Sequence, residues 1–324
     1  MPKKLADAIL GADLHIRPGK PQSRIDDFQK AMWTKFEFIL SLSVENDFCP
    51  ILFAGDLGQE SEWPNWLLRK FLSTLLKASP LKPIELIVIP GQHDLPNHNL
   101  SLWKKSGLGV LEIKDSITLL YSDNQNHTDL TRFTFSGHSK YNQFYIHPFP
   151  YGQPIKNCLQ CKQKGRQFYS VAMAHDLILA KEGRGWEQGK GLNGISLLKQ
   201  FPEYDLILTG DNHKSFVLEH QGRLLVNPGS MMRSAADQID HQPRVYLWYA
   251  DEKRVEIAYL PIEKEVLSRE RIEKQEEKER RMQAFVESIK PGEIKIKFEE
   301  NMKIHLRENP ASPEVEQKIW DCFN

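Results

Sequence analysis

The chain has 324 residues with 43 basic and 43 acidic side chains, so its formal net charge is zero and no global field attracts it to a polyanion. Hydrophobic residues make up 40% and charged residues 27%, the balance of a globular protein with a sizeable core. Four cysteines are too few for a disulfide scaffold, and no apolar run approaches the roughly 18 residues of a membrane span. We therefore expect a cytoplasmic protein without membrane association.

Short apolar runs alternate with helical patterns in the first part of the chain. The runs at 8–12, 51–54 and 84–89 predict buried strands. Apolar residues at helical spacing predict a helix over 25–42, and a second helix is expected over 66–76. This β-α-β-α-β order implies parallel strands joined by crossover helices.

The middle of the chain is richer in short strands. Apolar or alternating segments predict further strands over 118–121, 133–135, 144–146, 169–174 and 206–208. The last predicted strands of this part form a β-meander over 215–218, 223–226, 244–250 and 255–260. The pattern predicts an α/β fold, a two-sheet α-β-β-α sandwich in which helices flank two packed sheets.

The composition changes after Pro261. Residues 262–289 are dense in Glu, Lys and Arg with sparse apolar positions, which predicts a long solvated helix ending before Pro291 and Gly292. The alternation over 293–298 predicts a strand, and two short helices are expected to complete the chain. The expected domains are 1–262, carrying the chemistry, and 263–324, a charged helical extension.

Ligand-type side chains follow several of the predicted strands. Asp13, Asp56, His93, His175 and Asp211 each fall at or just beyond a strand end. The carboxyl ends of parallel strands share one edge of a sheet, where ligands bind. We therefore expect these side chains to converge on one cleft.

Short motifs surround these positions. They are Asp13-Leu14-His15, Gly55-Asp56-Leu57, Gly91-Gln92-His93-Asp94, the single His175, Gly210-Asp211-Asn212-His213 and the turn Asn227-Pro228-Gly229-Ser230. Carboxylate, imidazole and amide groups are ligands for divalent cations, and a glycine lets the backbone turn sharply beside them. Asp13-Leu14-His15, Gly55-Asp56-Leu57 and the single His175 are weak signals alone, Gly91-Gln92-His93-Asp94 after a strand and a proline is more specific, and the ordered set makes chance unlikely.

In this order the motifs resemble those of the calcineurin-like metallophosphoesterases, D-x-H, G-D, G-N-H-D, a single H and G-H-x-H, over residues 8–232. The resemblance implies two divalent metal ions. One would be held by Asp13, His15, Asp56 and His213, and the other by Asp56, Gln92, His175 and Asp211. Asp56 would bridge them, His93 would protonate the leaving oxygen of the substrate, and Asp94 would hold the His93 ring.

Two positions depart from the family pattern. Gln92 stands where the family has Asn, and Asp211 replaces the first His of G-H-x-H. The amide oxygen of Gln92 is displaced by one methylene, and Asp211 exchanges a nitrogen ligand for a charged oxygen. Harder ions are therefore favoured at this site, Mn²⁺ first with Mg²⁺ as the alternative, over Zn²⁺.

A finer resemblance points to the SbcD-type nuclease subunit of bacterial and phage DNA repair. It rests on Ala12-Asp13-Leu14-His15, on Asn227-Pro228-Gly229-Ser230-Met231-Met232-Arg233 and on the charged tail. It implies a Mn²⁺-dependent DNA nuclease, an SbcC/Rad50-type ATPase partner and a homodimer. Candidate substrate-binding residues are Arg17, Asn227, Ser230 and Arg233.

Other hypotheses stay open at this point. The tail either docks on the ATPase or is a solvated helix on its own domain. The enzyme is either this nuclease or a stand-alone phosphodiesterase or phosphatase acting on small molecules or phosphoproteins, and a non-catalytic scaffold is a third reading.

Overall fold

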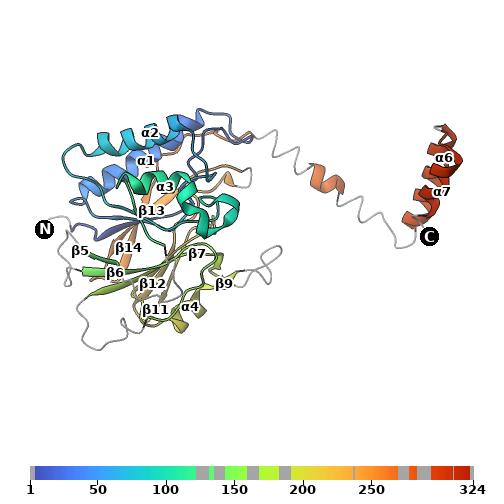
Figure 1. Ribbon diagram of the computed structural model, residues 1–324. Helices are drawn as coiled ribbons and strands as arrows, with labels where there is room; N and C mark the ends of the chain where they lie inside the picture. The colour runs from blue at the N-terminus through green and yellow to red at the C-terminus, as the bar shows by residue number, and fades with distance from the viewer. Residues whose placement is uncertain are drawn as a thin grey trace. The chain divides into compact units, whose positions relative to one another are not determined.

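The structure, a computed structural model, describes residues 4–121, 131–134, 143–158, 168–181, 191–235, 238–268, 277–282, 293–308 and 310–321 (Figure 1). The chain divides into two compact units, Met1–Ser268 and Arg269–Asn324. The first unit carries every candidate site residue.

The first of two six-stranded sheets has the order β14-β13-β1-β2-β3-β4. Its strands are β1 (Ala8–Gly11), β2 (Ile51–Phe53), β3 (Leu86–Val88), β4 (Thr118–Leu119), β13 (Arg244–Tyr249) and β14 (Arg254–Tyr259). β1 to β4 pair in parallel, as the alternation of strands and helices predicts. The connecting helices are α1 (Phe28–Glu45), α2 (Asn65–Ala78) and α3 (Gly107–Ile113), with 3-10 turns at Pro96–His98 and Leu100–Lys105.

The second sheet has the order β11-β12-β10-β7-β6-β5. Its strands are β5 (Thr131–Thr134), β6 (Gln143–Phe149), β7 (Tyr169–His175), β10 (Leu206–Gly210), β11 (Phe216–His220) and β12 (Arg223–Asn227). Helix α4 (Gly194–Gln200) and a small sheet of β8 (Ile178–Leu179) and β9 (Leu192–Asn193) accompany it.

Side-chain alternation along the strands builds the layers. Leu10 points into the core between the two sheets, while its neighbour Ile9 packs beneath α1 and α2. In the second sheet Leu208 faces the same central core, and Ile207 faces α4. Helices therefore cover the outer face of each sheet, with α1, α2 and α3 on one side and α4 on the other (Figure 1). The predicted α/β sandwich of two sheets is confirmed.

The predicted β-meander is wrong. β11 and β12 form a hairpin in the second sheet, whereas β13 and β14 form a hairpin in the first. The chain crosses between the sheets because β1 is buried along its whole length and needs a hydrogen-bonding neighbour on both sides. β13 supplies the second neighbour by pairing antiparallel with β1.

The C-terminal part also differs from the prediction. Residues 262–268 are not helical, and Val266 and Leu267 are each 4% exposed. Backbone hydrogen bonds join this segment to residues 23–25: Ile25 N–H donates to the Val266 carbonyl, and Ser268 N–H donates to the Ser23 carbonyl. Burial of this apolar pair outweighs the helix propensity of the charged residues around it. Residues 277–282 are helical, while the rest of the expected helix over 269–289 lies outside the described residues.

The strand expected over 293–298 is the beginning of helix α6 (Glu293–Glu308), which α7 (Pro313–Asp321) follows. α6 is rich in Glu and Lys and contains no Gly or Pro, and six alternating residues are too few to outweigh that helical propensity. Among the described helices, none is long and apolar enough to cross a membrane.

Candidate metal centre

The carboxyl ends of β1, β2, β3, β7 and β10 bring the sequence-predicted ligands together. His175 ends β7 and is paired in register with Gly210, the last residue of β10. Across the sheets, Asp13, Asp56 and His175 place one ligand atom each within 4.8 Å of one another. Residues that lie far apart in the sequence thus meet at one edge of the sandwich.

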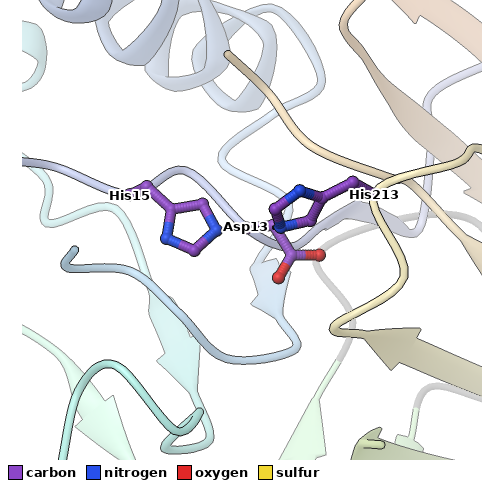
Figure 2. A group of neighbouring side chains, drawn as sticks. All are labelled: Asp13, His15 and His213. Carbon is purple, nitrogen blue, oxygen red and sulfur yellow. Dashed lines mark hydrogen bonds between the residues drawn. The ribbon is translucent and has the colours of Figure 1, made fainter. Parts of the chain in front are cut away.

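One group of ligand atoms consists of Asp13, His15 and His213 (Figure 2). Their ligand atoms also lie within 4.8 Å of one another, and the Nε2 atoms of the two imidazoles are 3.2 Å apart. Two ring nitrogens and a carboxylate that face one point form a suitable site for a divalent cation.

Asp56 lies between this group and His175. Its Oδ2 atom is 4.0 Å from His15 Nε2 and 3.5 Å from His175 Nε2. Its Oδ1 atom accepts a hydrogen bond of 2.9 Å from the backbone N–H of His93. The His175 ring donates from Nδ1 to the carbonyl of Ala54 over 2.7 Å, which leaves Nε2 as its ligand atom. Asp56 therefore has the position that a bridging ligand needs.

Gln92 and Asp211 form a pair of their own. The Gln92 amide donates from Nε2 to Asp211 Oδ1 over 2.6 Å. The backbone N–H of Asp211 donates to Asp13 Oδ1 over 3.2 Å, which ties this pair to the other ligands. Within the described part of the chain, Asp211 joins none of the groups of three ligand-type residues.

Several buried polar atoms in the cluster have no hydrogen-bond partner among the described residues. They are Asp13 Oδ2, His15 Nδ1, Asp56 Oδ2, Gln92 Oε1 and His175 Nε2. An unpaired buried acceptor costs free energy, and a buried carboxylate costs more. Cations bound among these atoms would interact with their lone pairs and remove this cost. The donor set therefore fits divalent metal ions.

The protonation of the cluster reflects the same crowding. Burial raises the pKa of Asp13 well above its usual value, although nearby His175 opposes the shift. Burial also lowers the pKa of His15 to about 3, against the attraction of Asp56. For His175, burial lowers the pKa, but the charge of the Asp56 carboxylate, 3.5 Å from Nε2, and the hydrogen bond to Ala54 outweigh burial and raise it to about 10. The cluster thus keeps a proton at His175 where no cation is bound.

The ligand loops have strained backbone conformations. Asp13, His15, Asp56 and Asp211 have φ angles of 54°, 53°, 53° and 76°, in the left-handed region. Such conformations cost roughly 1–3 kcal/mol each and are concentrated at functional sites. Hydrogen bonds from Asp13 N to Gly55 O and from His15 N to Asp56 O hold the first two loops in place.

Glycines allow the loops to close around the ligands. Gly55 has a φ of 86°, and a Cβ atom there would lie 2.2 Å from His175 Nδ1. At Gly91 a Cβ atom would lie 2.2 Å from Asp56 Oδ1. The G-D and G-Q-H-D motifs therefore contain glycine because a side chain would occupy the place of a ligand.

Asp94 has a different position from the one predicted. Its carboxylate accepts backbone hydrogen bonds from Gly58 at 2.8 Å, Gly91 at 3.0 Å and Leu57 at 3.3 Å. Burial and the nearby Asp56 charge raise its pKa to about 7. Among the described residues, the side-chain partner of the His93 ring is Gln59, whose Nε2 lies 3.4 Å from Nδ1. Asp94 therefore fastens the two loops together rather than the imidazole.

The turn over 227–233 is hydrogen-bonded to the backbone around the ligand His213. The Asn227 amide donates to the carbonyls of Asn212 at 2.6 Å and Lys214 at 2.8 Å, on either side of His213. The backbone N–H of Ser230 donates to the carbonyl of His213 over 3.2 Å. Both side chains are buried: the Asn227 amide and the Ser230 backbone position His213, while the Ser230 hydroxyl donates to the carbonyl of Met232 over 2.8 Å.

The two arginines expected to bind substrate differ in their hydrogen bonding. Arg233 is half-buried and donates from Nε to the carbonyl of His241 over 2.7 Å. Arg17 is also half-buried, and its Nε atom has no hydrogen-bond partner among the described residues. Gln59, His98 and Tyr151, near His93, were not singled out from the sequence because they belong to none of its motifs.

The chain matches the family model described as calcineurin-like phosphoesterase over residues 12–215. No curated protein is a match. A solved structure from Staphylococcus aureus assigned as a 5′-nucleotidase is similar at 13% identity and a TM-score of 0.47, over 82% of this chain and 55% of its own length. A structure described as a novel archaeal phosphodiesterase is similar at 11% identity and a TM-score of 0.38, over 78% of this chain and 99% of its own. On the family match alone, which spans more than half of the residues, the chain belongs to the calcineurin-like phosphoesterase family.

Proposed function

We propose that the chain is a Mn²⁺-dependent DNA nuclease that hydrolyses phosphodiester bonds in DNA end processing beside an SbcC/Rad50-type ATPase. The observation that carries phosphodiester hydrolysis is the position of Asp56 between two groups of ligand atoms at one sheet edge. Asp13, His15, Asp56, Gln92, His175, Asp211 and His213 would hold two divalent cations there, which would polarise the phosphoryl oxygens and lower the pKa of a water molecule.

His93 is the candidate general acid. Its backbone N–H is held by Asp56, and its half-buried ring lies 5.2 Å from the His15 ring, centroid to centroid. The Gln59 amide nitrogen lies 3.4 Å from Nδ1, which leaves Nε2 as the ring nitrogen that can face a substrate. A protonated His93 ring would donate a proton from Nε2 to the leaving oxygen of a phosphodiester and return to the neutral imidazole.

The metal preference follows from the donor set. One cation would be held by Asp13, His15, Asp56 and His213, and the other by Asp56, Gln92, His175 and Asp211. Only one of the four ligands in the second set is an imidazole. Oxygen ligands favour Mn²⁺ or Mg²⁺ over Zn²⁺, so we expect activity with Mn²⁺ first.

DNA as the substrate is supported by the turn over 227–233, whose sequence resembles the SbcD-type pattern and whose backbone holds His213. A formal net charge of zero leaves most of the phosphate binding to another subunit. The C-terminal unit, with α6 and α7, is then the ATPase-docking element, and the nuclease subunits form a homodimer.

The test is an assay on three substrates, a 3′-labelled DNA duplex, a labelled single strand and a chromogenic phosphodiester, each with Mn²⁺ and with Mg²⁺. We expect cleavage of DNA with Mn²⁺, enhanced by an SbcC-type ATPase. Cleavage of the small ester alone would refute the nuclease proposal and favour a stand-alone phosphodiesterase. No cleavage of any substrate by metal-loaded protein would favour the non-catalytic scaffold.

A further inference from the structure

Two exposed rings continue the row of imidazoles that begins in the metal centre. The His93 ring lies 6.4 Å from the His98 ring, and the His98 ring lies 6.2 Å from the Tyr151 ring, measured between centroids. His98 is exposed, and Tyr151 is 38% exposed. The row therefore leads from the candidate general acid to the protein surface.

The backbone builds this row at some cost. Asn97 and His98 have φ angles of 53° and 54°, two consecutive residues in the left-handed region. The His98 ring donates from Nδ1 to the carbonyl of Gln92 over 3.0 Å, which fixes it to the ligand loop. Strain at a residue that is fixed to an active site points to a functional role.

Tyr151 lies just after a strand of the second sheet and is hydrogen-bonded to the backbone next to the Gly91 loop. It follows β6, and its backbone N–H donates to the carbonyl of Pro90, just before the Gly91 motif, over 3.0 Å. Among the described residues its hydroxyl forms no hydrogen bond, so only the ring has a contact there. A single exposed aromatic residue needs no explanation, but two rings placed beside a general acid by separate loops do.

We propose that His98 and Tyr151, whose rings are tilted by 58° to each other, form an angled stacking platform that takes the face of the leaving nucleoside's base on one ring and its edge on the other. This inference rests on the proposed phosphodiester cleavage, since His93 must reach the leaving oxygen. The nucleoside attached to that oxygen then lies on the side of His93 where the two rings are placed. Stacking is tolerant of sequence because every base has a π-face, so the platform selects nucleotidyl substrates over diesters without a base.

The first experiment measures binding without turnover. A short single-stranded DNA containing 2-aminopurine is added to the metal-free full-length protein, and stacking is followed as quenching of 2-aminopurine fluorescence. Tyr151→Ala and His98→Ala should each weaken binding by roughly five- to a hundredfold and remove quenching. Tyr151→Phe should retain both, because the ring rather than the hydroxyl makes the contact.

The matched control is Tyr259→Ala, which removes a tyrosine that is 53% exposed on β14. This variant should bind like the wild type. Thermal stability and Mn²⁺ stoichiometry are measured for every variant, so that loss of folding is separated from loss of stacking. Equal quenching by the wild type and Tyr151→Ala would overturn the platform.

The second experiment compares cleavage of normal DNA with DNA whose leaving nucleoside is abasic. The wild type should cleave the abasic substrate at a kcat/KM lower by roughly five- to a hundredfold, and Tyr151→Ala should not distinguish the two. DNA cleavage without any abasic effect would refute the platform and leave the nuclease proposal standing. Quenching that depends on Tyr151 in a protein that cleaves no DNA would refute the nuclease proposal and retain the platform.

Discussion

The two halves of the metal centre differ in how completely their ligand atoms are assembled. In the first half, Asp13, His15 and His213 already present their ligand atoms to one point. In the second half, the Gln92 amide turns its nitrogen toward Asp211 instead of offering its oxygen to a cation. A cation in the second half must therefore replace the Gln92–Asp211 hydrogen bond and turn the amide, whereas one in the first half replaces the hydrogen bond between the His15 and His213 rings, whose nitrogens already face the site. This difference predicts a tight first site and a weaker second site.

Asp56→Asn should have the largest effect because it removes the carboxylate shared by both halves. We expect phosphodiesterase activity to fall on the order of 10⁴-fold or more, since both cations lose a charged ligand in one substitution and they act as a unit. Activity and bound Mn²⁺ are measured on the same preparation. A variant that still bound two Mn²⁺ ions and turned over normally would contradict the bridging position of Asp56.

His93→Ala should break catalysis while leaving the comparison between the halves intact. Loss of a general acid lowers kcat by roughly 10²- to 10³-fold. Both Mn²⁺ affinities should stay near those of the wild type in calorimetric titration, because His93 is outside both expected ligand sets. The defect should shrink for substrates with a good leaving group, which needs little protonation. An equal defect for all leaving groups would exclude the acid role.

Gln92→Asn combined with Asp211→His should sharpen the comparison by restoring the family pattern in the second half. An imidazole in place of a carboxylate favours Zn²⁺ over Mn²⁺, and we expect the preference to change by roughly 10- to 100-fold. Competition between the two metals is measured by mass spectrometry or calorimetry. The variant Lys30→Gln, an exposed change on α1, is the control. An unchanged metal preference would indicate that these two residues do not ligate.

The pH dependence of Mn²⁺ binding should differ between the halves. His175 has its pKa raised to about 10, so below that pH a cation must displace its proton. Affinity of the second half should therefore rise by up to roughly tenfold per pH unit and level off near pH 10. In the first half the lowered pKa values of His15 and His213 leave both rings neutral, so the proton that a cation must displace there is the one on Asp13, whose pKa is raised by burial.

The same shift affects the metal-free protein. A raised folded-state pKa contributes stability below pH 6.5, and that contribution is lost as the pH rises toward 10. Thermal unfolding in a chelator should show this decline, and His175→Gln should reduce it. Metal binding that is independent of pH would contradict the protonated state of His175.

The convergence of the ligands could be predicted because strand ends are visible in the sequence and parallel strands share an edge. The left-handed backbone of Asp13 and Asp211 could not, since a motif records residue types and not dihedral angles. The place of Asp94 was mistaken for a similar reason. A carboxylate next to a histidine suggests a dyad, but three backbone N–H groups from neighbouring loops compete for it.

The sheet to which β13 belongs could not be predicted from the local sequence pattern either. Its alternation is the same in a meander and in a hairpin that crosses to the other sheet, and only its pairing with β1 decides between them. That pairing joins residues that are far apart in the sequence, such as Ala8 and Trp248. The series of ring contacts from His93 to His98 and Tyr151 could not be predicted either, because no sequence motif relates these residues.

The late arrival of β13 has a consequence for how the protein is made. All seven proposed metal ligands precede Lys214, and the family match ends at residue 215. Yet β1, which leads to Asp13 and His15, is still an open edge strand until Arg244–Tyr249 has been synthesised. On the ribosome, all the ligand residues are therefore synthesised before the strand that completes the sheet around β1. A fragment that ends at the last ligand should leave the edge of β1 unpaired and prone to aggregation.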